Sequence, residues 1–486
     1  MKKYLLALAA LIVVLIAVVF VRALSVSPPT IAQSESPAMV VDSNAVAQHL
    51  AAAVRFPTIS YGNGVKEDEK NAQLDAMRGW MEKTYPAFHR AAAREVVGRS
   101  LLFTWKGRNA KLPPILLMAH MDVVPVVPGT EKDWTHAPFS GDIANGYVWG
   151  RGSIDDKGAL ICILEAAEKL AASGFTPQRT IMFAFGQDEE VGGAKGNTAI
   201  AKMLQLRGIH FAWVLDEGGA IVDNAPPNVR EPVAFLDVAE KGYLSVQLVA
   251  HGEGGHSSRP TKNMAPARLA KAVLAVLEHP FASGLDAIQR EKLHVLAPLT
   301  PFGDRLLLAN LWLTAPLVED SMERTPDGAA YLHTTIAPTM MNAGVKDNVI
   351  PPTATATINF RLHPGDTIAN VVAHVQKAVD DPKVDAIALT ESQSEASKIA
   401  DIDGASYKYI VRTIEDSFHV PVAPDTLGAA TDSRHYLDLA DDVFRLDPFH
   451  FKLSDLPRIH GTNERLAVRD LGPAVAGYAR LMKGAK

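Results

Sequence analysis

The sequence predicts an α/β fold: a mixed, largely parallel sheet sandwiched by helices, with a smaller α+β domain inserted into the chain. Two patterns and the chain length predict this arrangement. From about residue 40, short apolar runs alternate with longer amphipathic runs, which is typical of βα units around a parallel sheet. From about residue 240, strand-like runs alternate apolar and polar residues, which indicates a sheet with one solvated face. The 486 residues exceed the roughly 100–200 residues of one ordinary domain, so we expect two.

The N-terminus carries an apolar run over residues 4–21 that contains no charge and no proline. As a helix with a rise of about 1.5 Å per residue, this run would cross most of a hydrocarbon core of about 30 Å. A cleaved signal peptide has a shorter apolar stretch of about 7–15 residues, so a membrane anchor over residues 1–24 is favoured and cleavage is the alternative. Lys2 and Lys3 are expected to stay cytoplasmic, which places the rest of the chain on the periplasmic, extracytoplasmic or lumenal side, or outside the cell after cleavage. Residues 25–40 are rich in serine and proline and predict a tether.

The first globular domain is expected to comprise residues 41–239 and 394–486. Its predicted strands are residues 115–119, 147–149, 180–185 and 212–215, and its predicted helices are residues 156–172 and 193–206. Polar residues follow the predicted strands. Because ligand sites of open α/β sheets gather at the carboxyl ends of strands, we expect these polar residues to converge.

The inserted domain is expected to comprise residues 240–393. It begins with a predicted strand and helix and ends with a second pair, over residues 242–251, 265–278, 354–362 and 368–379. The chain then returns near residue 394 to the first domain, which is therefore discontinuous. The returning segment carries Asp432, His435 and His460.

Composition excludes several classes of function. The net charge of −6 and the absence of a basic stripe argue against nucleic acid as a partner. The single cysteine, Cys162, excludes an intrachain disulfide and a Cys-rich metal site, so a metal would need histidine and carboxylate ligands. Cys162 lies in an apolar, helix-like run, where we expect it to be buried and inert.

His120 and Asp122 stand at the end of a predicted strand. Residues two apart in a strand point to the same face, which places the Asp122 side chain against the His120 ring. A metal-bound imidazole commonly donates its second N–H to a carboxylate, so this spacing suits a ligand and its orienting partner. Taken alone, the pair is also compatible with a solvated turn.

Paired acidic residues follow at two further places. Asp155 and Asp156 lie in a glycine-rich turn. The N-cap of a helix would account for one of these aspartates, but it accounts less completely for two in a row. A carboxylate there can bridge two cations about 3.5–4 Å apart. Glu189 and Glu190 follow another strand, so one can ligate while the other acts as general base, although a solvated acidic loop is the alternative.

Two further ligand candidates stand apart from these pairs. Asp216 follows a buried strand, with Glu217 expected as its exposed neighbour. His460 is a lone histidine far along the chain, and a lone histidine is more often not a ligand. Only the ensemble of these residues favours a metal centre.

Five motifs occur in order along the chain: MAHMDVVPV, GRGSIDDKG, DEEVGG, LDEGG and IHGTNERL. Together they resemble the co-catalytic zinc metallopeptidase family of glutamate carboxypeptidase, aminoacylase-1 and carnosinase, and within it the branch of carboxypeptidase S and the N-fatty-acyl-amino-acid synthase/hydrolases. The resemblance runs from about residue 45 to the C-terminus. It implies a zinc-exopeptidase-like catalytic domain with an inserted lid or dimerisation domain.

The resemblance also implies roles for individual residues. Asp155 would bridge two Zn²⁺ ions, or Co²⁺ or Mn²⁺ in their place. Asp122 would orient His120, and Glu189 would take a proton from the attacking water and deliver it to the leaving amine. The implied metal ligands are His120, Asp155, Glu190, Asp216 and His460.

Residues of the inserted domain and of the returning segment are implied in substrate binding. His256, in the motif GHSSRP, would donate to the oxyanion, often across a dimer interface. Arg361 would bind the free carboxylate of the substrate, because a guanidinium pairs with a carboxylate in a bidentate manner. Asn348 would grip the substrate beside it, and Gly428 begins the substrate-loop motif GAATDSRH.

The sequence thus predicts a zinc-dependent hydrolase of amide bonds next to a free carboxylate, acting on short peptides or N-acyl amino acids as a homodimer held to a membrane. A reversible synthase/hydrolase is the alternative, since sequence does not set the direction of the reaction. A non-catalytic binding protein on the same fold is disfavoured because base, bridge and ligands are all present. A serine hydrolase or a one-zinc protease is disfavoured because neither Gly-x-Ser-x-Gly nor His-Glu-x-x-His occurs.

Overall fold

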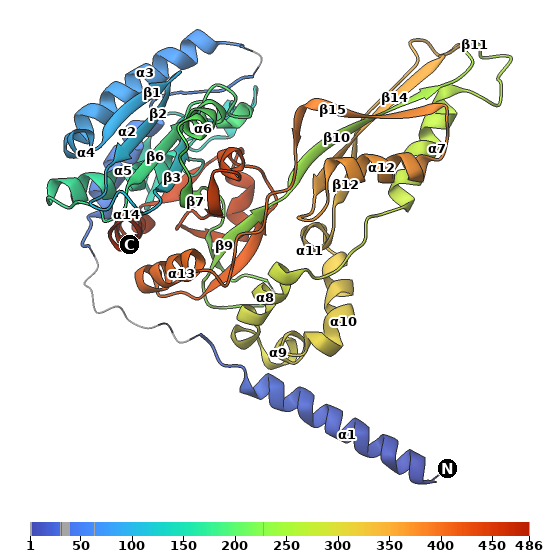
Figure 1. Ribbon diagram of the computed structural model, residues 1–486. Coiled ribbons are helices and arrows are strands. Elements are labelled where there is room, and N and C mark those ends of the chain that lie inside the picture. Colours follow the sequence, from blue (N-terminus) through green and yellow to red (C-terminus); the bar gives the residue numbers. More distant parts are fainter. Residues whose placement is uncertain (1, 30, 32–38, 63, 227, 486) are drawn as a thin grey trace.

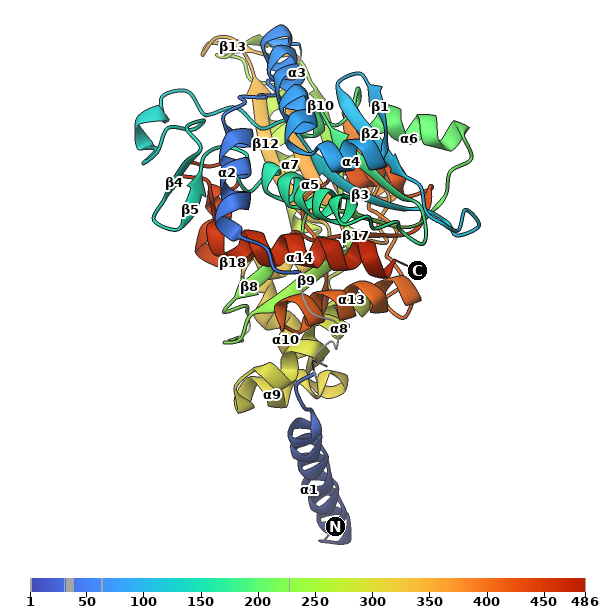
Figure 2. The ribbon, with the colours of Figure 1, turned by 90° about the vertical axis from the view of Figure 1, so that its left-hand side faces the viewer.

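The computed structural model describes residues 2–29, 31, 39–62, 64–226 and 228–485. Figures 1 and 2 show a body built on a large sheet, a second sheet that projects from it, a group of helices below both, and the long helix α1 (Lys2–Ser25) extending away. Thirteen further α-helices are described: α2 (Ser43–Val54), α3 (Glu67–Thr84), α4 (Pro86–Ala91), α5 (Lys157–Ala172), α6 (Asn197–Leu206), α7 (Ala265–Glu278), α8 (Ala287–Leu296), α9 (Phe302–Leu308), α10 (Leu311–Glu323), α11 (Pro326–Leu332), α12 (Ile368–Val379), α13 (Ala405–Phe418) and α14 (Val468–Gly484).

The large sheet is mixed. Its order is β1-β2-β6-β3-β7-β17-β9-β8-β18, with β16 paired to β9. The pairs β3/β6, β3/β7, β7/β17, β9/β16 and β8/β18 are parallel, and β1/β2, β2/β6, β8/β9 and β9/β17 are antiparallel. Its strands are β1 (Ala93–Val97), β2 (Ser100–Trp105), β3 (Ile115–His120), β6 (Ile181–Gly186), β7 (Phe211–Asp216), β8 (Ile221–Asp223), β9 (Val233–Glu240), β16 (Val422–Leu427), β17 (Ala440–Arg445) and β18 (His450–Lys452).

Helices cover both faces of this sheet, which confirms the predicted α/β class. Along β3 and β6 successive residues face opposite sides, as the pleat requires. Leu117 and Phe183 pack with helices α2, α4, α5, α13 and α14, whereas Leu116 and Met182 pack with α6. Both faces are therefore apolar, which explains why these strands read as continuous hydrophobic runs. Cys162 of α5 is buried in the first of these two cores.

One predicted strand belongs to a different sheet. Residues 147–149 form β5 (Tyr147–Trp149), which pairs with β4 (Asp142–Ala144) and β19 (Arg465–Ala467) in a small antiparallel sheet rather than with β3 or β6. This pairing brings the C-terminal segment that contains His460 next to the turn that contains Asp155.

The second sheet has the order β12-β14-β10-β15. Its strands are β12 (Thr335–Ala343), β14 (Thr353–Leu362), β10 (Gly242–His251) and β15 (Val384–Ser394). Alternate residues of β10 are buried against α7 and α12, so the sheet has one covered face, as its period of two predicts. A short ribbon of β11 (Gly255–His256) and β13 (Val349–Ile350) lies at its far tip (Figure 1). The chain passes between the two sheets at Glu240–Gly242 and again after Ser394. The limits of the inserted domain, residues 240 and 393, stay predictions.

A group of four helices, α8 to α11, was not predicted. It occupies residues 287–332, between α7 and β12, and its core is formed by apolar residues such as Leu293, Leu308 and Val318. Helix α8 packs against β16 of the large sheet. The group therefore joins the inserted segment to the body that contains the large sheet.

Helix α1 is long and apolar enough to cross a membrane, and its apolar stretch is exposed. Its C-terminal end contacts α9 (Figure 1). Residues 30 and 32–38 of the predicted tether lie outside the described residues.

Candidate metal centre

Asp155 lies between two histidines that are far apart in the chain. Its Oδ1 is 2.8 Å from Nε2 of His120, at the end of β3, and its Oδ2 is 2.9 Å from Nε2 of His460. Each oxygen of this one carboxylate therefore faces a different histidine. This is the arrangement that a carboxylate bridging two cations requires.

Glu190 completes the cluster on the side of His460. Strand β6 ends at Gly186 and is followed by a short 3₁₀-helix (Glu189–Val191), which turns Glu190 so that its Oε2 is 3.2 Å from Nε2 of His460. The other oxygen, Oε1, accepts a hydrogen bond from the amide of Val124 at 3.1 Å. One oxygen is thus anchored to the backbone and the other faces the centre.

Glu217, and not Asp216, faces His120. The Oε1 of Glu217 is 3.5 Å from Nε2 of His120, whereas the Oδ2 of Asp216 accepts a hydrogen bond from the amide of Ser433 at 2.8 Å. Strand β7 ends at Asp216 and Glu217 directly follows it, so the two side chains leave the backbone in different directions. Glu217, expected to be an exposed neighbour, is only 14% exposed in its side chain. The structure corrects that expectation and makes Glu217 a further candidate ligand, while the role of Asp216 stays a prediction.

Two sets of ligand atoms lie within 4.8 Å of one another: His120, Asp155 and Glu190, and His120, Asp156 and Glu217. Asp156 also anchors His120, because its Oδ2 accepts a hydrogen bond from the amide of His120 at 3.0 Å. Its Oδ1 is buried and has no hydrogen-bond partner among the described residues. A buried, unpartnered carboxylate oxygen is costly unless a cation or proton satisfies it.

The charges of the cluster also fit a cation. Asp155 and Glu190 raise the pKa of His460 to about 10. Burial and the neighbouring carboxylates raise the pKa of Glu189 and Glu217 well above the ordinary value. Carboxylates brought this close in a buried site repel one another unless positive charge lies between them. The residues present therefore fit divalent metal ions.

A buried ion pair holds the two segments of the centre together. Nη1 of Arg151 is 2.5 Å from Oε2 of Glu464, and its Nη2 donates to the carbonyls of His460 and Gly461. The Oε1 of Glu464 accepts from the amides of Ile154 and, at 3.3 Å, Asp155. This pair was not predicted, although its residues lie inside the motifs GRGSIDDKG and IHGTNERL.

The side chain of Asp122 lies against the His120 ring, as predicted, and makes further contacts. The Nδ1 of His120 is 3.0 Å from the carbonyl oxygen of Asp122 and 3.5 Å from its carboxylate. The carboxylate accepts hydrogen bonds from the hydroxyl of Ser60 at 2.6 Å and from the amide of Glu189 at 3.1 Å. Asp122 thus contacts His120 through both its backbone carbonyl and its carboxylate, and its carboxylate also holds the amide of Glu189.

His256 and Asn348 lie at the far tip of the second sheet, away from the ends of β3, β6 and β7 (Figure 1). His256 pairs with Val349, and the carbonyl of Asn348 accepts a hydrogen bond from the amide of Ser257. The Nδ1 of His256 accepts from the amide of Ser258 at 3.1 Å. The structure therefore brings these two predicted residues together but not to the metal cluster of the same chain.

Arg361 lies at the opposite end of the second sheet. It pairs with Tyr243, where the chain enters this sheet, and its guanidinium lies 4.7 Å from the centre of the Tyr243 ring. Gly428 directly follows β16, whose last residue, Leu427, pairs with Glu240. Arg361 and Gly428 thus flank the crossing between the two sheets.

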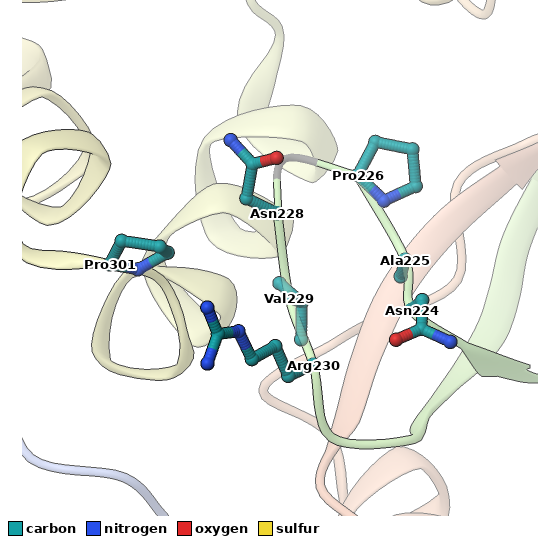
Figure 3. A pocket seen from close by; sticks show the side chains of 7 residues that line it. All are labelled: Asn224, Ala225, Pro226, Asn228, Val229, Arg230 and Pro301. Atoms are coloured by element: carbon teal, nitrogen blue, oxygen red, sulfur yellow. The ribbon is translucent and has the colours of Figure 1, made fainter.

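A cavity of about 520 Å³ lies elsewhere, between the segment after β8 and the start of α9 (Figure 3). It shares no residue with the metal cluster. Its lining residues are Asn224, Ala225, Pro226, Asn228, Val229, Arg230 and Pro301.

Comparison with known proteins agrees with this geometry. The model of the peptidase family M20/M25/M40 matches residues 116–484. The chain is 37% identical over 449 residues to the probable carboxypeptidase S-like 2 of Dictyostelium discoideum, covering 90% of this chain and 84% of that protein. It is 36% identical over 434 residues to the human N-fatty-acyl-amino acid synthase/hydrolase PM20D1, covering 87% and 84%.

Solved structures share the fold at low sequence identity. The M20 family metallo-carboxypeptidase Sso-CP2 from Sulfolobus solfataricus has a TM-score of 0.63 at 18% identity and covers 90% of this chain and 98% of its own. Human carnosine dipeptidase 1 has a TM-score of 0.60 at 14% identity and covers 90% and 95%. The chain belongs to peptidase family M20/M25/M40 and is a metallopeptidase or amidohydrolase of this metal-dependent family.

Proposed function

We propose that this enzyme hydrolyses amide bonds that lie next to a free carboxylate, in short peptides or N-acyl amino acids. The observation that carries the proposal is the position of Asp155, whose two carboxylate oxygens each face a different histidine. Such a bridge is typical of hydrolases with two metal ions.

The proposed ligands are His120 and Glu217 for one ion, Glu190 and His460 for the other, and Asp155 for both. Zn²⁺ suits this set, since histidine nitrogens and carboxylate oxygens are its usual ligands where no cysteine is available. Co²⁺ and Mn²⁺ are the alternatives. Asp216 was predicted as a ligand where Glu217 is now proposed, and the choice rests on Glu217 lying 3.5 Å from Nε2 of His120.

Bound divalent metal would supply a Lewis acid that polarises the substrate carbonyl and makes water more acidic. Glu189 is the proposed general base. Its backbone amide is held by Asp122, and burial, followed by the acidic neighbours, raises the pKa of its carboxylate. A carboxylate with a raised pKa accepts a proton from water more readily and can then deliver it to the leaving amine.

Arg361 is proposed to bind the free carboxylate of the substrate. It stands at the base of the second sheet, near Gly428 and the crossing between the sheets, and burial lowers the pKa of its guanidinium. A partly desolvated guanidinium forms stronger ion pairs with a carboxylate than an exposed one. Gly428 has no side chain, so its backbone would remain accessible to the substrate at the crossing between the sheets.

The alternative is a reversible N-fatty-acyl-amino-acid synthase/hydrolase. It is favoured by the identity of 34–37% to proteins that carry this name in Xenopus tropicalis, cow, mouse, human and zebrafish. The amide and the groups that bind it would be the same in both directions.

A homodimer through the inserted domain is also proposed. His256 and Asn348 lie at the tip of the second sheet, away from the metal cluster of their own chain. In the proposed homodimer these two residues of one subunit would reach the metal cluster of the other subunit. Placement of the catalytic body outside the cytoplasm, held by α1, is proposed from the length of that helix.

The experiment is release of free amino acid from a panel of dipeptides and N-acyl amino acids, with C-terminally amidated analogues as controls. Elemental analysis of the same preparation should give about two metal ions per chain. Chelator should abolish turnover, and added Zn²⁺ should restore it. Turnover that persists in chelator, or equal turnover of the amidated analogues, would contradict the proposal.

A further inference from the structure

Helix α1 is docked on the helical group rather than separated from it. The rings of Phe20 and Phe302 lie 5.9 Å apart, centre to centre. The side-chain amide of Asn310 donates to the carbonyl of Val19 at 3.1 Å, and Nε of Arg22 donates to the carbonyl of Ala309 at 3.3 Å. The last turns of α1 therefore have a defined position on α9 and the start of α10.

Beside this contact, α9 and α10 expose large apolar side chains to solvent. We call this set the α9–α10 face. Its members and their exposed fractions are Phe302 (41%), Leu307 (38%), Trp312 (55%), Leu313 (44%) and Leu317 (64%). The helical group has its own core, formed by residues such as Leu308, Ala315 and Val318. The exposed residues are therefore not needed to fill it.

The apolar character stops halfway along α10. The exposed positions of its first half are Trp312, Leu313, Pro316 and Leu317, whereas those that follow are Asp320, Ser321, Glu323 and Arg324. A helix whose exposed side changes from apolar to charged along its axis suits a boundary between an apolar medium and water.

Helix α1 indicates where that boundary lies. The apolar run of residues 4–21 spans about 27 Å as a helix, close to the hydrocarbon thickness of about 30 Å. Arg22, at its outer end, is exposed and would lie at the level of the lipid headgroups. Since Arg22 contacts Ala309 and Phe20 contacts Phe302, α9 must lie at that same depth.

We propose that the α9–α10 face is a membrane-contact surface that enters the boundary between headgroups and acyl chains beside α1. The occupant is the lipid bilayer, because the face is continuous with the helix that would cross it. A tryptophan among leucines is the composition expected at this depth. The inference rests on the proposal that α1 stays attached to the chain, and it is independent of the catalytic chemistry.

Trp312 provides the test. Of the six tryptophans, Trp105, Trp134, Trp149 and Trp213 are buried and Trp80 is half-buried, whereas Trp312 is exposed. The full chain is reconstituted in nanodiscs of phosphatidylcholine brominated near the top of its acyl chains, with ordinary phosphatidylcholine as reference. The emission of Trp312 is obtained as the difference between wild type and Trp312→Phe. We expect loss of this emission in the brominated lipid.

Two variants on α10 serve as a matched pair. Leu317→Glu should protect Trp312 from quenching, because a carboxylate is expelled from the acyl region, whereas Ser321→Glu on the polar half should leave the quenching unchanged. Equal quenching in both variants, or none in wild type, would overturn the inference. A different result would also overturn the inference: wild type is not quenched and forms a dimer in detergent, and Leu317→Glu dissociates that dimer. The α9–α10 face would then contact a second copy of the chain.

Further measurements separate this inference from the proposals on which it stands. Intact mass of chain extracted from cell membranes reports whether α1 is retained, and its removal would overturn the inference. Turnover of N-acyl amino acids is measured in the same nanodiscs. Quenching without turnover would contradict the proposed function and leave the membrane-contact surface standing.

Discussion

Arg151 and Glu464 form an ion pair in the interior of the protein, with Nη1 and Oε2 2.5 Å apart and both side chains at most 2% exposed. The pair links the turn that carries Asp155 to the segment that carries His460. Removing one partner of a buried pair leaves an uncompensated charge. We therefore expect this pair to support both the stability of the protein and its metal affinity.

Glu464→Ala should lower the free energy of unfolding by about 3–5 kcal/mol. It should also weaken metal binding by roughly 10–100-fold, because Asp155 and His460 lose their common support. Urea denaturation and competition with a chromophoric chelator measure the two effects. The control is Glu95→Ala, which breaks the exposed pair with Arg207 and should cost about 1 kcal/mol or less. Unchanged metal affinity in folded Glu464→Ala would refute the supporting role.

Glu217→Gln should reduce bound metal more than Asp216→Asn does. Glu217 faces His120, whereas Asp216 is engaged with the Ser433 amide. Elemental analysis after dialysis against graded chelator gives the comparison, with circular dichroism to verify that both variants are folded. If Asp216→Asn lost more metal than Glu217→Gln, Asp216 and not Glu217 would be the ligand.

Glu189→Gln should keep its metal but lose turnover by roughly 10²–10⁴-fold, the usual contribution of a general base. The amide has nearly the same shape as the carboxylate but cannot accept the proton. Metal content and kcat are measured on one preparation, and loss of metal together with activity would instead indicate that Glu189 is a ligand.

Arg361→Lys should lower kcat/KM for substrates with a free carboxylate by about 10–100-fold, the effect of about 1.5–3 kcal/mol from a charge-assisted bidentate contact. Slow turnover of the amidated analogues should change little, since they lack the group that Arg361 would bind. A similar loss for both kinds of substrate would mean that Arg361 has only a structural role.

Lys241 predicts a dependence of stability on pH. Burial, reinforced by Arg361, lowers the pKa of Lys241 to about 8, from an ordinary 10.5. Between these values the unfolded chain binds more protons than the folded chain, so the contribution of Lys241 to stability rises with pH across this window and is constant below it. The free energy of unfolding of wild type, taken relative to that of Lys241→Met, should rise by on the order of 1–3 kcal/mol between pH 7 and pH 10.

Urea unfolding at the two pH values measures this gain. Lys398→Met, at an exposed pair with Asp438, is the matched control and should show no comparable change. A wild-type advantage that is the same at both pH values would argue that the Lys241 ammonium is not desolvated. The hydrogen bonds of Lys241 to Ala330 and His333 lie outside the metal cluster, so metal content should not affect the result.

The regular elements of the inserted segment were predictable because their periodicity is local. The expected strand over residues 242–251 and the expected helices over residues 265–278 and 368–379 are β10, α7 and α12 with the same bounds. Helices α8 to α11 were missed. Helices α8, α9 and α11 are short, with 10, 7 and 7 residues, and α10 contains Pro316, so no long periodic pattern marks them.

The sequence by itself determined the α/β class, the family motifs and the acidic and histidine residues from which the centre is drawn, because these depend on residue type and on spacing within short segments. Only the tertiary structure decided which of Asp216 and Glu217 faces His120, how Asp155 lies between His120 and His460, and that α1 contacts α9. Neighbouring acidic residues are equivalent in a motif, and the path of the chain after β7 decides which of them faces His120. The pairing of β5 with β19 brings the distant segment of His460 to the turn of Asp155.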